Sequence, residues 1–170
     1  MVRAFTTLTF TDAVRAAQVM RGSRDFCSAL ELKSENRLLD ERSASFIAEC
    51  DSFMIGTASR EGWPHVQHRG GPKGFLRIID PTTLAFADFS GNRQYISVGN
   101  LSENDRIFIF ILDYHQQQRM KIWGRAAVVE DDDALIALVG DPHYGSKAER
   151  VILINVEAWD FNCRQHIPKR

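Results

Sequence analysis

The chain contains few cysteines and no long apolar segment. Its three cysteines, Cys27, Cys50 and Cys163, are odd in number and widely spaced, which argues against a disulfide framework. We therefore expect reduced thiols and a cytoplasmic protein. No apolar run approaches the length of a membrane-spanning helix, and the N-terminus lacks the apolar core of a signal peptide. These absences argue against a secreted or membrane-embedded protein.

The chain also lacks an excess of charge of either sign. Its formal net charge is −1, whereas nucleic-acid-binding proteins are usually strongly basic, so we expect no nucleic-acid partner. Hydrophobic residues make up 44% of the chain and charged residues 25%, and both fractions are typical of a soluble globular protein. With 170 residues, the chain is long enough to bury the core of one domain.

The sequence changes character near residue 46. Residues 1–45 are predicted to form an N-terminal helical segment, in which Asp12 caps a helix over 13–20 and Gly22 ends it. Residues 46–170 are predicted to form a β-rich domain, because short β-branched and aromatic runs alternate there with turn residues.

Turn residues divide the β-rich region into hairpins. Arg60-Glu61-Gly62 and Asp80-Pro81-Thr82-Thr83 each join two predicted strands. A short helix is expected over 95–101. Short strands at close spacing with appended helices favour a mainly β, α+β fold built on an antiparallel barrel rather than a βαβ sheet. The predicted strands cover 53–59, 65–69, 75–79, 84–88, 106–112, 120–129 and 151–156.

Two basic segments marked by glycine lie at the ends of predicted strands. The first is His68-Arg69-Gly70-Gly71-Pro72-Lys73-Gly74, and the second is Gly91-Asn92-Arg93-Gln94. Glycine lets backbone N–H groups approach a ligand closely, and arginine and lysine supply positive charge for an anion. The pattern suits a phosphate-bearing cofactor. It also suits two ordinary turns with solvated charges, since neither segment matches a dinucleotide-binding or P-loop motif.

Six segments carry a family resemblance through their order and spacing. They are Ser52–Ser59, Gly62–Gly71, Leu84–Tyr95, Gly99–Leu101, Lys121–Ala126 and Trp159–Ile167. The second strand carries His-Arg-Gly-Gly at 68–71, and the C-terminus carries Asn-Cys-x-Gln-His at 162–166. Together they resemble the pyridoxamine 5′-phosphate oxidase-like family of FMN-binding split barrels, in its uncharacterised flavin-nucleotide-binding branch. The resemblance covers roughly residues 45–170.

The resemblance implies a fold and an assembly. The fold is a six-stranded Greek-key split barrel over 46–170, on which the segment 1–45 packs. The assembly is a homodimer with FMN in a groove between the chains, and C2 is the common symmetry for such pairs. The run Ile107–Leu112 has too many large apolar residues in succession for a half-solvated strand, so we expect both of its faces to be covered. Either a second chain covers one face, or the strand lies inside the core of one chain.

Two classes of function follow from the resemblance. The first is an FMN-dependent oxidoreductase related to pyridoxamine 5′-phosphate oxidase, in which the flavin takes two electrons from a small-molecule substrate or a nicotinamide donor. The second is a non-catalytic protein that binds FMN, haem or a deazaflavin for storage, sensing or transfer. The C-terminal Asn-Cys-x-Gln-His string differs from the oxidases, so their substrate-binding roles do not carry over.

The resemblance also implies roles for residues near the flavin phosphate. In the family, the second strand runs beside the flavin ring and basic residues just beyond it bind the phosphate. A Ser-Arg-Lys-like step after the fourth strand binds the phosphate too, and Gln94 replaces its lysine. Arginine can hold a phosphate through two N–H groups, whereas lysine acts as a point charge. The implied phosphate and ring residues are Gln67, His68, Arg69, Gly70, Lys73, Asn92, Arg93 and Gln94.

Further candidates lie outside these two segments. Asp88 stands where the family often has threonine. Because a carboxylate beside a phosphate is unfavourable, we expect Asp88 to face the ribityl hydroxyls or Arg93. Arg119 matches a polar residue near the flavin pyrimidine, where a cation would stabilise the anionic reduced flavin; the other interpretation is a charge at the edge of a loop. At the C-terminus, Trp159 matches a tryptophan that closes over the flavin, and Gln165 and His166 complete the candidate site.

Other chemistries are less well supported by the spacing. His65 and His68 are three residues apart, so on a regular strand they point to opposite faces and make poor joint metal ligands. Cys163 beside His166 could form a thiolate–imidazole pair, although a buried structural cysteine explains it as well. His68 and His166 are the candidates for an acid–base residue above the reactive nitrogen of the flavin.

Overall fold

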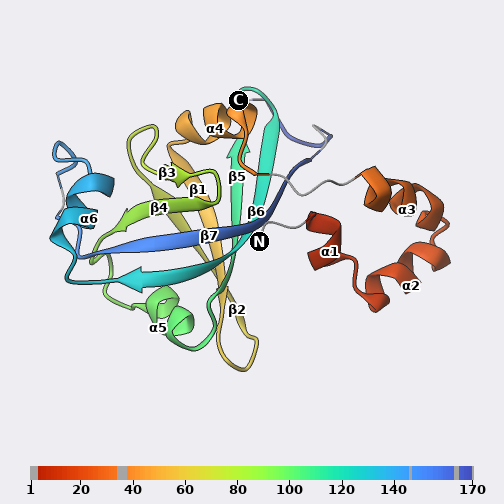
Figure 1. Cartoon of the computed structure of the whole chain (residues 1–170), viewed down its shortest axis with the longest axis horizontal. Coiled ribbons are helices and arrows are strands. Elements are labelled where there is room, and N and C mark those ends of the chain that lie inside the picture. The colour runs from red at the N-terminus through yellow and green to blue at the C-terminus, as the bar shows by residue number, and fades with distance from the viewer. Residues whose placement is uncertain (1–3, 34–37, 146, 163–164, 170) are drawn as a thin grey trace.

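A single antiparallel sheet forms the framework of the protein (Figure 1). The computed structural model describes residues 4–33, 38–145, 147–162 and 165–169. Within them the strand order is β2-β1-β5-β6-β7-β4-β3. This confirms the prediction of a mainly β fold with appended helices, with one strand more than the resemblance implied. The strands are β1 (Ser52–Ala58), β2 (Pro64–Gly70), β3 (Arg77–Asp80), β4 (Thr83–Asp88), β5 (Arg106–Asp113), β6 (Gln118–Val129) and β7 (Arg150–Asn162).

The sheet curls around its core without closing. Phe53 on β1 and Phe86 on β4 lie four strands apart in the sheet order, a separation of about 19 Å if the sheet were flat. Their ring centroids are only 5.3 Å apart, in an edge-to-face contact. The strands therefore bend toward each other, and β2 and β3 remain as the two edges. Between the curled halves lies an apolar core that includes Ile109, Ile122 and Ile154, all fully buried.

Six helices accompany the sheet in the described residues. The fourth packs against the top of the barrel, the fifth lies below β1 and β2, and the sixth borders β4 and β7 (Figure 1). The first three extend to one side and are considered below. The helices are α1 (Phe5–Thr9), α2 (Asp12–Met20), α3 (Arg24–Lys33), α4 (Glu41–Ala48), α5 (Ile96–Glu103) and α6 (Asp133–Val139).

The cap of α2 differs from the prediction by one residue. Thr11, not Asp12, occupies the N-cap position, and its side chain accepts a hydrogen bond from the Val14 N–H at 3.3 Å. Asp12 is the first helical residue, where its negative charge favours the positive end of the helix dipole. Gly22 follows the helix with a left-handed φ of 69°, as expected for a residue that ends it.

Strands β1, β5 and β6 carry apolar side chains on both faces. On β5, Ile107, Ile109 and Ile111 are buried in the core, whereas Phe108 and Phe110 on the other face are only half-buried. Because paired residues share a face, the register Met54–Phe110 and Phe108–Trp123 places these four side chains on one surface. We call it the outer face, and it also includes Val66, which pairs with Gly56 on the same side.

The outer face tests the expectation that both sides of β5 are covered. Met54 is 43% exposed and Val66 is 65% exposed. Within one chain the strand therefore has one core face and one face that is only partly covered, so it is not a two-sided core strand of a monomer. Further, no helix in the described part of the chain combines the length and the apolar character needed to cross a lipid bilayer.

A glycine substitution tests the close contact between β6 and β7. A Cβ at Gly124 would lie 2.6 Å from the Asn155 carbonyl oxygen and 3.0 Å from Ile154 Cγ2. We expect Gly124→Ala to lower the free energy of unfolding by roughly 1–3 kcal/mol because the backbone must shift. Gly99→Ala in α5 meets nothing within 4 Å and should be neutral or stabilising by up to about 1 kcal/mol. Urea denaturation measures both; equal effects would contradict this packing.

Candidate functional site

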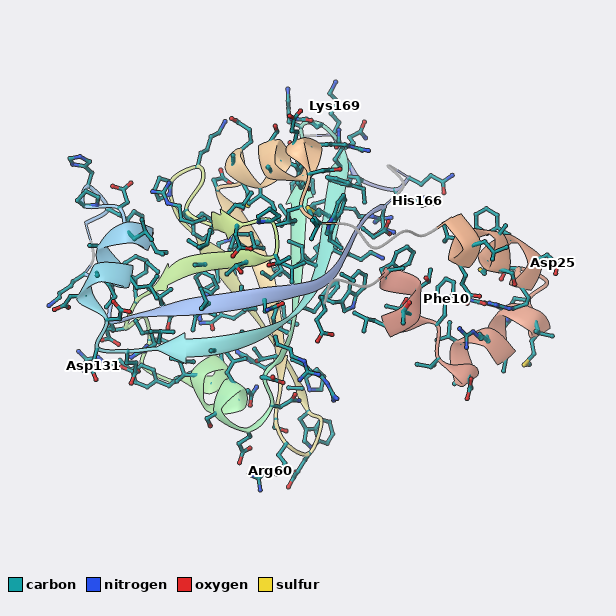
Figure 2. The ribbon with its side chains drawn as sticks, viewed as in Figure 1. Phe10, Asp25, Arg60, Asp131, His166 and Lys169 are labelled. Atoms are coloured by element: carbon teal, nitrogen blue, oxygen red, sulfur yellow. The ribbon has the colours of Figure 1, made fainter. Side chains whose placement is uncertain are left out.

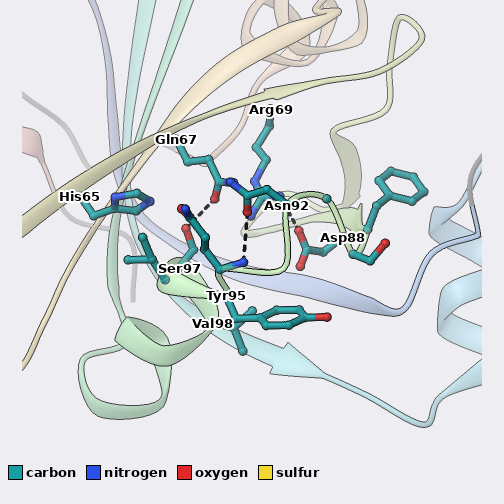
Figure 3. Close-up of a pocket in the computed structure, with 13 residues that line it drawn as sticks. His65, Gln67, Arg69, Asp88, Asn92, Tyr95, Ser97 and Val98 are labelled. Carbon is teal, nitrogen blue, oxygen red and sulfur yellow. Dashed lines mark hydrogen bonds and ion pairs between the residues drawn. The ribbon is translucent and has the colours of Figure 1, made fainter.

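A pocket opens between β2 and the start of α5, and we call it the α5 pocket (Figure 3). Its volume is about 140 Å³, below the roughly 300–1,000 Å³ that small-molecule sites usually enclose. The pocket is therefore large enough for part of a cofactor only. Its lining residues are His65, Gln67, Arg69, Asp88, Phe89, Ser90, Gly91, Asn92, Gln94, Tyr95, Ile96, Ser97 and Val98.

The alternation of β2 decides which of its side chains reach the pocket. His65, Gln67 and Arg69 face it, because every second residue of a strand points to the same side. Gln67 accepts a hydrogen bond from the Ser97 hydroxyl at 2.9 Å. The Asn100 amide donates to the Thr57 hydroxyl at 3.0 Å. These two bonds fix α5 beneath β1 and β2, with the first turn of the helix at the pocket.

The backbone leading into α5 has the features of an anion site. Gly91, Arg93 and Tyr95 all have left-handed conformations, with φ values of 49°, 60° and 51°. Turns containing such residues gather N–H groups into a concavity that suits anions, and the strain at a non-glycine residue is often found at functional sites. No side chain caps α5 at Tyr95. The positive end of the helix therefore points its N–H groups toward the pocket.

A buried ion-pair network forms one wall of the pocket. Asp88 is 2% exposed and lies between two guanidinium groups. Its Oδ1 is 2.5 Å from Arg69 Nη1, and its Oδ2 accepts a hydrogen bond from Arg150 Nη1 at 3.1 Å. Asp88 thus faces Arg69 and Arg150 and not Arg93. Among the described residues, the buried Arg69 Nε has no hydrogen-bond partner.

Arg150 holds the network together, and the sequence reasoning missed it. Besides Asp88, it donates to Glu130 at 2.9 Å and to Glu149 at 2.6 Å, and it lies over the Tyr95 ring at 5.1 Å. Burial lowers the pKa of Arg150, but the hydrogen bonds to Glu130 and Asp88 and the charge of Asp88 outweigh it and raise the pKa above its ordinary value. Arg150 pairs with Asp88 through the β4–β7 register, which the sequence alone does not show.

Four of the predicted phosphate and ring residues lie outside the α5 pocket. Lys73 is exposed and forms an ion pair of 2.7 Å with Glu49, which raises the pKa of Lys73. Gly70 follows the pocket side chains of β2 but does not line the pocket. His68 is exposed on the outer face, opposite Met54. Arg93 belongs to the loop, yet its exposed side chain does not line the pocket either.

The remaining candidates form a second group, remote from the pocket. Arg119 pairs with Leu112 on β5 and with Asn162 on β7. It lies two residues before Lys121, which pairs with Phe110 of the outer face, so Arg119 lies on the outer face as well. Its buried Nε has no hydrogen-bond partner among the described residues. Gln165 and His166 are exposed, and His166 lies at the side of the molecule opposite to α5 (Figures 1 and 2).

Trp159 is a core residue in this chain. It is 5% exposed and packs edge-to-face against Phe161 at 5.7 Å. Cys163, proposed as a partner of His166, lies outside the described residues. His65 and His68 point to opposite sides of β2, and no cluster of three or more potential metal ligands occurs in the described part of the chain.

The curled antiparallel sheet with its appended helices places this protein in the class of split-barrel proteins. The sequence model of the family described as pyridoxamine 5′-phosphate oxidase matches residues 39–163, well over half of the chain. The protein therefore belongs to the pyridoxamine 5′-phosphate oxidase family, and the resemblance found in its sequence is confirmed. No curated protein sequence matches the chain.

Solved structures share the fold at low sequence identity. HupZ of Group A Streptococcus is 17% identical, with a TM-score of 0.59 over 77% of this chain and 98% of that one. A putative pyridoxamine 5′-phosphate oxidase of Lactobacillus delbrueckii is 18% identical, with a TM-score of 0.57 over 72% and 93%. An F420 reductase is 17% identical, with a TM-score of 0.50 over 68% and 94%. At these identities the likeness establishes the fold alone.

The Asp88 network yields a stability prediction. Arg150→Met leaves a buried carboxylate with only one of its two cations, and we expect a loss of roughly 3–5 kcal/mol in the free energy of unfolding. Arg125→Met removes a guanidinium that also bonds two carboxylates, Asp105 and Glu157, but is 43% exposed. Its loss should cost far less stability than the loss of Arg150, because exposed ion pairs contribute little. Chemical denaturation distinguishes the two, and similar losses would show that burial of the network does not matter.

Proposed function

We propose that this protein is an FMN-binding flavoprotein and an oxidoreductase, with the flavin phosphate bound in the α5 pocket. The observation that carries the proposal is the combination of an uncapped helix start, a left-handed loop and the unsatisfied Arg69 Nε at one pocket. A phosphate supplies acceptor oxygens for all three. Arg69 would bind it directly, and the N–H groups at 95–98 would complete the contact.

The charges around the pocket support this assignment. Arg150 and Asp88 form a buried ion pair, so the carboxylate does not present its full charge to an incoming anion. Arg69 touches the same carboxylate from the pocket side and keeps its Nε for the ligand. Asp88 therefore positions Arg69, which answers the concern that a carboxylate beside a phosphate is unfavourable.

Two observations support a homodimer with the flavin between the chains. First, the α5 pocket encloses only part of the volume that a small-molecule site usually needs. Second, the candidate residues of one chain divide into a pocket group with Arg69 and an outer-face group with Arg119, on opposite faces of the sheet. A second copy seated on the outer face brings the pocket of one chain to Arg119 of the other. The apolar outer face supplies the surface for that contact.

When bound, the flavin supplies two-electron transfer between a reduced donor, such as a nicotinamide or a small molecule, and an acceptor. The chain's own residues bind and orient it. Arg69 and the α5 backbone hold its phosphate, and Gln67, fixed by Ser97, lies on β2 beside the ring position. Arg119 of the second copy places a positive charge near the ring, where negative charge on the flavin is favoured.

Flavin titration tests the phosphate site. We expect flavin-stripped protein to bind FMN stoichiometrically, with quenched flavin fluorescence, and Arg69→Gln to raise the dissociation constant about tenfold to a hundredfold. Arg93→Gln should cost less because that side chain is exposed outside the pocket. The control Arg60→Gln, in the exposed β1–β2 turn, should leave the affinity unchanged.

The outcomes of the titration separate the parts of the proposal. An Arg69→Gln variant with wild-type affinity would move the phosphate out of the α5 pocket. Bleaching of the bound flavin by NADH or NADPH supports a reductase, whereas tight binding with no bleaching by any tested donor favours a carrier or sensor. No FMN binding at all contradicts the proposal, and a deazaflavin and haem are then the ligands to titrate.

Mixed dimers test whether the two residue groups combine between chains. Arg69→Gln and Arg119→Gln chains, each impaired alone, are coexpressed with different affinity tags. In a mixed dimer one site contains both mutations and the other contains neither, so about half of the sites in dimers purified through both tags should have wild-type affinity. Titration of dimers purified through both tags measures this. If the groups act within one chain, every site stays impaired.

A further inference from the structure

Two of the N-terminal helices project away from the barrel. Helix α1 is attached to the sheet, with Thr6 buried and the Phe5 ring stacked on Trp123 at 6.1 Å. Helices α2 and α3 then extend beyond the edge of the barrel (Figure 1), where Figure 2 labels Phe10 and Asp25. The chain is attached again at Leu39, which is buried and donates its N–H to the Pro81 carbonyl. We call residues 11–33 the arm.

The arm has no apolar core of its own. The buried residue of α2 is Gln18, and no α3 residue whose side chain the structure describes is buried. Two polar contacts join the helices: Arg24 bonds Gln18 at 2.6 Å, and Arg15 bonds Glu31 at 3.3 Å. Arg24 also bonds Glu31 within α3 at 2.7 Å. Helices of 9 and 10 residues are marginal in water without tertiary packing. The arm therefore needs a partner surface.

The arm exposes several large apolar side chains. Val19, Met20, Phe26 and Leu32 are between 64% and 89% exposed. Arg15 and Arg24 direct their charges to Glu31 inside the arm, so these groups do not define a basic or acidic face. Exposed apolar side chains of this size are typical of a contact with another protein surface, and the absence of a basic stripe disfavours nucleic acid and anionic lipid.

We propose that the arm packs on a second copy of this chain and extends the homodimer interface. The arm is joined to the outer face through α1, because Phe5 of α1 lies on Trp123, a member of that face. A copy seated on the outer face is therefore the nearest surface that Phe26 and Leu32 can reach, since the arm points away from its own barrel (Figure 1). Under C2 symmetry, each arm covers the other copy. This inference rests on the proposed homodimer but does not need a bound flavin.

Photochemical cross-linking locates the arm in the assembled protein. The photoreactive residue p-benzoylphenylalanine replaces Phe26 in one sample and Leu138 in another, each mixed with isotopically heavy chain. Leu138 on α6 is 65% exposed and lies at the opposite end of the molecule (Figure 1). We expect light–heavy cross-linked peptides joining position 26 to the barrel of the other chain, and none from position 138. Cross-links from position 26 only within one chain would overturn the proposal.

The strength of the dimer provides a second measurement. In Phe26→Ser/Leu32→Ser, both changes remove exposed side chains, so the chain should fold, which circular dichroism checks. We expect its dimer dissociation constant to rise about tenfold or more in sedimentation equilibrium, whereas Leu138→Ser should leave it unchanged. If the double variant is a dimer with an unchanged dissociation constant, the proposed arm contact is overturned but the homodimer is not. A monomeric wild-type protein overturns both the arm contact and the homodimer, whatever the FMN titration shows.

Discussion

The buried carboxylate of Asp88 connects parts of the sheet that strand pairing leaves apart. In the strand order β2-β1-β5-β6-β7-β4-β3, β2 is an edge and β4 is five strands away. Arg69 on β2 reaches Asp88 on β4, and Arg150 on β7 holds the same carboxylate from the other side. No backbone ladder joins β2 to β4, so this ion-pair network bridges the open seam of the curled sheet. The loop into α5 and the pocket beside it depend on that bridge.

The same network accounts for the electrostatics of the pocket. A buried carboxylate next to an anion site would repel its ligand unless cations offset the charge. Two arginines surround Asp88, and Glu130 and Glu149 in turn surround Arg150. Negative and positive side chains therefore alternate from Glu130 and Glu149 through Arg150 and Asp88 to Arg69, which lies at the pocket. In the proposed site, Arg69 and the uncapped helix start are the positive groups that bind the phosphate.

The two faces of the sheet differ in what they carry. The inner side carries the core and the α5 pocket, whereas the outer face carries half-buried phenylalanines, exposed Met54 and Val66, and Arg119. Helix α1 joins the outer face to an arm that has apolar side chains and no core. All of these features are unsatisfied in one chain, and the second copy of the proposed dimer would satisfy them together. The proposed dimer thus explains the small pocket, the uncovered face of β5 and the projecting helices by one contact.

Local patterns in the sequence predicted where the strands, the hairpin turns and the helix over 95–101 lie, because these depend on residues close together in the chain. The prediction for the last strand, 151–156, was too short, because β7 extends to Asn162. The resemblance to the family placed Gln67, Arg69, Asp88, Asn92 and Gln94 in one candidate site, and all five line the α5 pocket. The pairing of Asp88 with Arg150, the engagement of Lys73 by Glu49 and the orientation of Arg93 away from the pocket were decided by the tertiary structure. Each depends on the register of strands or the return of loops far apart in sequence, and a side chain's charge is available to a ligand only when no such neighbour takes it first.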